Sequence, residues 1–134
     1  MKSYQIHLIR HAQTKANLKG QYIGVTDVSL SQSGIEALKN LNKRYKYPNA
    51  SLFFTSPLKR CIQTLDIIYP GVTPVKVDGL KECNFGDWEY KTADELANDI
   101  TFKSWLNDSQ NISPPNGESG MIFTHRICKA FENL

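Results

Sequence analysis

The sequence lacks the features that mark several classes of protein. Its 134 residues contain no apolar run near the roughly 18 residues that a membrane helix needs, and no long run of lysine and arginine. The net charge of +3 is too small to indicate binding to nucleic acid. Residues 1–5 are too polar and too few for a signal peptide. We therefore expect a soluble protein that binds neither membrane nor nucleic acid.

Cysteine is also scarce. Three cysteines occur, Cys61, Cys83 and Cys128, and their odd number and unpaired spacing favour a reducing compartment, where disulfides are rare. We therefore expect a cytoplasmic protein. Hydrophobic residues make up 40% and charged residues 22%, a balance that excludes a disordered chain. Because this length suits one domain, residues 1–134 are expected to form a single domain.

Strand and helix patterns alternate along the chain. Short apolar runs at 4–10, 51–55 and 72–77 are typical of buried strands. Segments with helical spacing separate or follow these runs, an alternation that indicates a parallel sheet covered by helices. The sequence therefore predicts an α/β fold, a three-layer α/β/α sandwich with a mostly parallel sheet.

Several residues predict where helices begin. Ser31 can cap a helix that continues to about Tyr45. Ser56 and Pro57 are a typical cap and first-turn pair for a second helix. A capping box at 92–95 predicts a short third helix, and the last segment, from about Glu118, has helical spacing.

Side chains suited to phosphoryl transfer follow three of the predicted strands. Arg10 and His11 end the first strand, Arg60 lies one helical turn beyond the second, and Glu82 follows the third. Carboxyl ends of parallel strands meet at one edge of a sheet, where ligands bind. An imidazole can attack phosphorus, guanidiniums match phosphate oxygens, and a carboxyl can protonate a leaving oxygen. Such a site requires no metal and no other cofactor.

These residues lie within motifs that resemble the histidine phosphatase (phosphoglycerate mutase-like) superfamily. Residues 8–14 read Leu-Ile-Arg-His-Ala-Gln-Thr and precede Asn17, where the family usually has Arg-His-Gly-Glu-Thr and a later Asn. Residues 56–64, 80–89 and 117–119 are similar to the family's following motifs, in order and at family-like spacing. The chain resembles the small alpha-ribazole phosphatases and broad-specificity phosphatases. The resemblance implies a phosphoglycerate mutase-like fold.

The resemblance also implies a role for each matched residue. His11 would be the nucleophile that becomes phosphohistidine, and Glu82 would be the general acid and then the general base. Three residues would bind phosphate: Arg10, Arg60 and Asn17. Three residues would lie near the mouth of the site and contact the substrate: Gln13, Gln21 and Tyr22.

Other assignments remain open from the residues alone. Glu89 and Glu118 are alternatives to Glu82 as the acid. Cys83 is the one cysteine beside the predicted site, but no loop of phosphate-facing glycines follows it, which disfavours a thiol nucleophile.

The sequence departs from the family pattern at two places. Ala12 stands where the family usually has glycine, which is tolerable if φ is negative and costly if φ is positive. The family also has a second histidine, in a His-Gly pair after a strand, and the sequence reaches Leu134 before any such pair. We therefore expect a partial domain, incomplete at its C-terminus, either as a truncated product or because part of the site is lost. An exposed sheet edge would then allow a homo-oligomer.

Three functions are open at this point. The main expectation is a phosphatase that hydrolyses a small phosphorylated metabolite through phosphohistidine at His11. A phosphoglycerate mutase-type transfer would use the same residues, but mutases carry extra loops that this compact chain lacks. A catalytically impaired phosphate-binding module is the third, because the second active-site histidine is absent.

Overall fold

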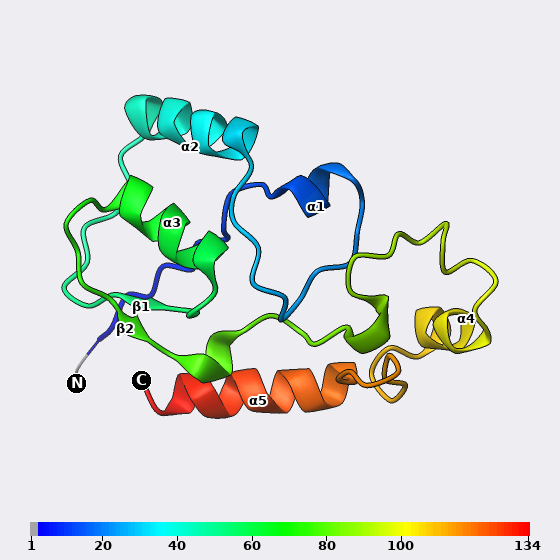
Figure 1. Cartoon of the computed structure of the whole chain (residues 1–134). Helices are drawn as coiled ribbons and strands as arrows, with labels where there is room; N and C mark the ends of the chain where they lie inside the picture. The colour runs from blue at the N-terminus through cyan, green and yellow to red at the C-terminus, as the bar shows by residue number, and fades with distance from the viewer. Residues whose placement is uncertain (1–2) are drawn as a thin grey trace.

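A two-stranded parallel sheet and the helix that connects its strands form one part of the molecule. The structure is a computed structural model that describes residues 3–134 (Figure 1). Strand β1 (Phe54–Thr55) pairs in parallel with β2 (Val75–Lys76), with Phe54 opposite Val75. Helix α3 (Lys59–Ile68) connects them. The predicted α/β fold with parallel pairing is confirmed, although both strands are shorter than their apolar runs.

The remaining helices surround this unit and extend beyond it. They are α1 (Lys15–Leu18), α2 (Gln32–Arg44), α4 (Ile100–Asn107) and α5 (Gly120–Glu132), with short 3-10 helices η1 (Asp78–Leu80) and η2 (Gly86–Trp88). Helix α2 packs on α3, and α5 runs beneath η1 (Figure 1). Ser31 and Ser119 cap α2 and α5, which confirms both predicted helices. Within residues 3–134, none of these helices has the length and apolar character to cross a membrane.

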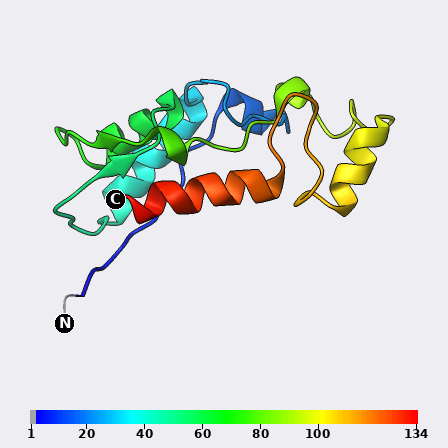
Figure 2. The ribbon, with the colours of Figure 1, turned by 90° about the horizontal axis from the view of Figure 1, so that it is seen from below.

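The predicted first strand does not form. Residues 4–10 are extended but have no strand assignment, and no backbone hydrogen bond among residues 3–134 joins them to a neighbouring strand. Tyr4 and Leu8 are 81% and 87% exposed. Figure 2 shows this segment leaving the body of the molecule. The prediction of a buried strand here is therefore wrong for this structure, because a strand is defined by a partner about 4.8 Å away.

Helix α3 begins later than the sequence predicts. Its cap is Leu58 rather than Ser56, and Leu58 has an extended backbone and no side-chain cap bond. The free N–H group of Lys59 instead donates to Oδ1 of Asp27 at 2.7 Å. A side chain 32 residues earlier therefore accepts one of the free N–H groups in the first turn of α3.

The capping box at 92–95 forms without a helix behind it. The backbone N–H of Thr92 donates to the Glu95 carboxylate at 2.7 Å, and Glu95 N–H donates back to the Thr92 hydroxyl at 3.3 Å. Residues 93–98 nevertheless form turns, and α4 begins only after Asp99, whose carboxylate accepts from Phe102 N–H. The prediction of a helix directly behind the capping box is therefore wrong, since residues 93–98 form turns and the next helix is capped by Asp99.

An aromatic core holds the segment between η2 and α4. Its buried members are Trp88, Leu96 and Phe102, and the partly buried Tyr22, Phe85 and Trp105 pack against them. The Trp88 and Phe102 rings meet edge to face at 5.3 Å. Such pairs contribute about 0.5–1.5 kcal/mol beyond their buried area. This core fixes η2 and the residues on either side of it.

Candidate active site

His11 lies where the extended N-terminal segment reaches helix α3. The next backbone N–H, that of Ala12, donates to the hydroxyl of Thr64 at 3.0 Å. The same hydroxyl donates to the Arg60 carbonyl at 2.7 Å. Ala12 is absent from the positive-φ residues of the described chain, so the methyl group at this family glycine position is tolerated. Helix α3 thus fixes the backbone beside His11.

The imidazole of His11 is oriented by the backbone carbonyl of Ala12. Its Nδ1 donates to this carbonyl at 2.7 Å, and because a carbonyl only accepts, Nδ1 carries the proton in this bond. The neutral ring then presents an unprotonated Nε2. Partial burial lowers the pKa of His11, and the positive charges of Arg60 and Arg10 lower it further, against the Ala12 bond and Glu82. The neutral, nucleophilic form is therefore favoured.

Arg60 is held in a buried position by a loop that precedes α2. Its side chain is only 2% exposed. One terminal nitrogen donates to the Gly24 carbonyl at 2.6 Å, and the other donates to the Thr26 carbonyl at 3.0 Å. A guanidinium has five N–H donors, so these two bonds orient the group and leave donors for an anion. Arg10, in contrast, is exposed.

Gly24 brings this loop against the loop that carries Glu82. A Cβ at Gly24 would lie 1.5 Å from the Cys83 carbonyl oxygen, so the approach is open only to glycine. The Gly24 N–H donates to both carboxylate oxygens of Glu89 at 3.0 Å. Phe85 N–H donates to the same carboxylate at 3.1 Å. Glu89 thus holds two backbone segments together, which disfavours it as the catalytic acid.

Of the three candidate acids, Glu82 has the carboxylate with the fewest hydrogen bonds. Its side chain is exposed and accepts one hydrogen bond, from Cys83 N–H at 3.0 Å, and its charge acts on His11. Glu118 is instead bound to Arg126, and this bond lowers the pKa of Glu118 more than any other contact. Glu118 therefore stays ionised and is unsuited to donate a proton.

Cys83 is unsuited to act as a nucleophile. Burial raises the pKa of its thiol to about 11, and the neighbouring carboxylates of Glu118 and Glu82 act in the same direction. The thiolate is the reactive form, and it is scarce at neutral pH with such a pKa. This result agrees with the interpretation of Cys83 as a residue that does not react.

Two of the predicted contact residues shape the loop after His11. Asn17 Oδ1 accepts from the backbone N–H and the hydroxyl of Thr14, each at 2.9 Å, and so completes the capping box in which Thr14 caps α1. Its amide nitrogen has no hydrogen-bond partner among residues 3–134, so it is available to an anion. The side chain of Gln13 is exposed, while its carbonyl accepts from Ser31 N–H at 2.9 Å.

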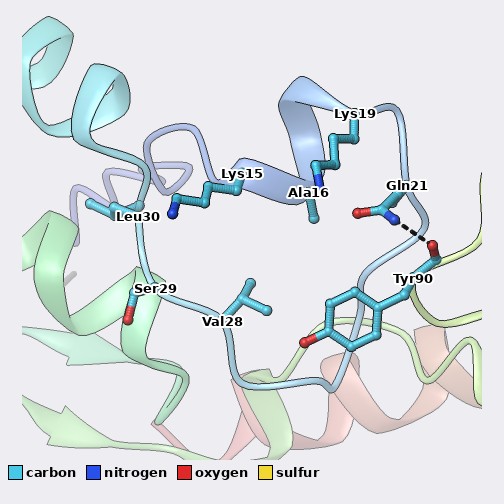
Figure 3. A pocket seen from close by; sticks show the side chains of 8 residues that line it. All are labelled: Lys15, Ala16, Lys19, Gln21, Val28, Ser29, Leu30 and Tyr90. Atoms are coloured by element: carbon cyan, nitrogen blue, oxygen red, sulfur yellow. Dashed lines mark hydrogen bonds between the residues drawn. The ribbon is translucent and has the colours of Figure 1, made fainter.

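The other two predicted contact residues, Gln21 and Tyr22, make contacts with residues outside the His11 loop. Gln21 donates to the Tyr90 carbonyl at 2.6 Å and lines a cavity of about 500 Å³ whose lining does not include His11 (Figure 3). The Tyr22 ring packs against Phe85, with centroids 5.3 Å apart. The charges of Arg60, Arg10 and Glu82 act on the pKa of His11, whereas Gln21 and Tyr22 make structural contacts elsewhere.

Sequence reasoning missed residues that position the site from a distance. Thr64, Asp27 and Arg126 all bind backbone groups of other segments. The sequence separations of these contacts are 52, 32 and 47 residues, so no local pattern indicates them. In the part of the chain that the structure describes, no three His, Cys, Asp or Glu side chains form a group able to hold a metal ion.

Known proteins resemble this chain over nearly its whole length. The adenosylcobalamin/alpha-ribazole phosphatase of Salmonella typhimurium is 31% identical over 97% of this chain and 66% of the relative. The crystal structure of the alpha-ribazole phosphatase from Shigella flexneri matches with a TM-score of 0.84 at 29% identity, over 93% of this chain and 64% of that one. A 2,3-bisphosphoglycerate-dependent phosphoglycerate mutase of Nitrobacter hamburgensis is 27% identical over 84% of this chain and 58% of the relative.

This chain matches only part of the length of each of these relatives. The chain spans just under two thirds of the length of the Salmonella phosphatase. The model of the histidine phosphatase superfamily (branch 1) matches residues 6–134. This match includes His11 and the three residues whose charges act on its pKa, Arg10, Arg60 and Glu82. The chain therefore belongs to branch 1 of the histidine phosphatase superfamily.

Proposed function

We propose that this protein is a phosphatase that hydrolyses a small phosphomonoester through a phosphohistidine at His11. The observation that carries the proposal is the hydrogen bond from Nδ1 of His11 to the Ala12 carbonyl, which leaves Nε2 as the free nucleophile. The lowered pKa of His11 supports a neutral imidazole near neutral pH. Phosphatase names among the relatives support hydrolysis.

The first step transfers the phosphoryl group to the protein. The lone pair on Nε2 of His11 attacks phosphorus, and the ester P–O bond breaks as the P–N bond forms. Glu82 gives its proton to the departing oxygen, which leaves as an alcohol. Arg60 and Arg10 stabilise the charge on the phosphoryl oxygens, because their forked donors fit phosphate geometry.

The second step returns the protein to its starting form. The carboxylate of Glu82 takes a proton from water, whose oxygen attacks phosphorus. The P–N bond breaks, its electron pair returns to Nε2 of His11, and inorganic phosphate leaves. Glu82 regains the proton that it lost, so atoms and charges balance over the cycle.

The substrate class follows from the relatives. Alpha-ribazole phosphate is the first substrate to test, because the Salmonella and Shigella proteins are alpha-ribazole phosphatases. Phosphoglycerate mutase-type transfer is the second candidate, favoured by the likeness to the Nitrobacter mutase. Three free cysteines support the further proposal of a cytoplasmic location.

Phosphate release from an aryl phosphate, with a chelator present, tests the proposed function. We expect turnover that survives the chelator, a protein mass increase of one phosphoryl group after acid-free quenching, and loss of both in His11→Ala. His125→Ala is the matched control, because His125 is an exposed histidine on α5. Turnover that persists in His11→Ala contradicts the proposal.

Two further outcomes distinguish the alternatives. Transfer between phosphoglycerates that depends on a bisphosphate primer would favour the mutase. Phosphate binding that stabilises the fold, with no labelling of His11, would favour a phosphate-binding module without turnover.

A further inference from the structure

Arg126, on α5, binds the loop that carries Glu82. One terminal nitrogen donates to the carbonyls of Gly79 and Lys81, both at 2.9 Å. The other terminal nitrogen donates to the Glu82 carbonyl at 3.2 Å. Three backbone carbonyls within four residues thus meet one guanidinium, which fixes the path of the chain up to the proposed acid.

Glu118 fixes the opposite side of the same guanidinium. Its carboxylate accepts from Nε of Arg126 at 2.8 Å and from a terminal nitrogen at 2.7 Å. The Phe123 ring lies against the guanidinium, 5.3 Å from its carbon to the ring centroid. These contacts hold the guanidinium in one orientation, because a bidentate pair fixes the plane of the fork.

All the donors of Arg126 are occupied by these contacts. A guanidinium has five N–H groups, and the protein supplies an acceptor for five hydrogen bonds. Arg126 therefore has no donor left for a phosphate. In this respect it differs from Arg60, which makes two such bonds.

A second contact between α5 and the acid loop lies one helical turn further on. A Cβ at Gly79 would be 2.6 Å from the Cβ of Ala130, so the loop packs directly on the helix. Figure 1 shows η1 lying along α5 at this place. The Glu82 loop is thus held by both a polar and a steric contact with the same helix.

We infer that Arg126 is a positioning residue for the general acid, acting through the backbone of residues 79–82. This inference rests on the proposed function, because it assumes that Glu82 protonates the leaving group. Release of the loop would displace the Glu82 carboxyl from the leaving oxygen and leave His11 and Arg60 in place, since α3 and the Gly24 loop hold those two.

The test compares esters that differ in their need for an acid. An activated aryl phosphate leaves without protonation, whereas an alkyl phosphate needs the proton. Single-turnover labelling of His11 is measured with 4-nitrophenyl phosphate and glycerol phosphate in the parent, Arg126→Gln and Arg126→Lys. We expect aryl labelling within about threefold of the parent and alkyl labelling reduced on the order of 100-fold in Arg126→Gln. Arg126→Lys should not restore the alkyl rate, because an ammonium lacks the fork.

Two controls separate positioning from general destabilisation. Lys129→Gln, which removes an exposed cation from the same helix, should label normally with both esters. In a Glu82→Gln background, Arg126→Gln should have little further effect on the rate of labelling by the alkyl phosphate. Both changes remove the same function, protonation of the leaving oxygen. Equal losses with both esters, or no loss with either, would overturn the inference.

Hydrogen exchange gives a readout that does not depend on activity. We expect faster amide exchange at residues 79–83 in Arg126→Gln and unchanged exchange at residues 12–14. Unchanged exchange at residues 79–83 would overturn the inference. If the parent is never labelled at His11, the proposed function fails together with the catalytic part of this inference, while the exchange data still decide whether Arg126 holds the loop.

Discussion

The backbone N–H of Ala12 donates to the hydroxyl of Thr64 at 3.0 Å, across 52 residues of sequence. This bond fixes the residue after His11, whose carbonyl in turn orients the imidazole. Helix α3 therefore carries Arg60 and also fixes the backbone beside His11, the proposed nucleophile. Because the segment before His11 has no strand partner among residues 3–134, the Thr64 contact is a main constraint on that backbone.

Replacement of Thr64 by valine should therefore weaken both stability and labelling. Thr64→Val keeps the shape but leaves the Ala12 N–H without its acceptor in a site where Thr64 is 4% exposed. We expect the free energy of unfolding to fall by about 1–3 kcal/mol, measured by urea denaturation. Thr64→Ser retains the hydroxyl and should keep most of the labelling rate at His11. Equal behaviour of the two variants would contradict this role.

Asp27 should stabilise α3 as a cap supplied by a distant loop. Its carboxylate accepts from Lys59 N–H at 2.7 Å, so Asp27→Ala should lower the free energy of unfolding by about 1 kcal/mol. The ion pair between Asp27 and the Lys59 ammonium spans 3.8 Å and is exposed, so Lys59→Ala should change stability by well under 1 kcal/mol. Denaturant titration of both variants measures the difference. A larger effect from Lys59→Ala would indicate that the ion pair dominates.

The lowered pKa of His11 predicts how stability depends on pH. The unfolded chain binds a proton at this histidine near the ordinary value of 6.5, and the folded chain binds it only at lower pH, chiefly because of burial. The contribution is therefore fully present above pH 6.5 and is lost as pH falls through the folded pKa. As pH falls through this range, the free energy of unfolding of His11→Asn should rise relative to that of the parent. An NMR titration midpoint for the His11 ring at or above 6.5 would contradict the prediction.

Glu118 predicts a second pH dependence, in a more acidic range. Its pKa is lowered by the bond to Arg126, so its contribution is present above the ordinary value of 4.5 and is lost as pH falls through the folded pKa. We expect Glu118→Gln to lower the free energy of unfolding by about 1–3 kcal/mol at neutral pH. This difference should shrink below pH 4.5 when unfolding is measured as a function of pH. A difference independent of pH would mean that packing, not charge, is the source.

Local patterns were enough to predict the motifs and several helices. Ser31 and Ser119 cap α2 and α5 because a hydroxyl and the N–H groups of the first turn are close in sequence. The order of motifs from His11 to Glu82 likewise indicated the superfamily that the match over residues 6–134 shows. Such patterns depend only on residues that are close in sequence, so they can be recognised without knowledge of the tertiary structure.

Local patterns failed where a distant group supplied the partner. The cap of α3 was predicted at Ser56, but the cap is Leu58, and the distant Asp27 binds the N–H of Lys59 behind it. The apolar run at 4–10 predicted a strand, but strand formation requires a second chain segment, and none pairs with it among residues 3–134. The residue types in a segment cannot show whether such a partner is present.

The sequence by itself determined the superfamily and the chemical types at the site: an imidazole, two guanidiniums and a carboxyl, each within a family motif. Only the tertiary structure decided how these groups are oriented and which of them are paired. The Ala12 carbonyl sets the tautomer of His11, and Arg126 removes Glu118 from the candidate acids by pairing with it. The physical reason is that protonation and orientation depend on groups within hydrogen-bond distance, and folding brings these groups from segments far apart in the chain.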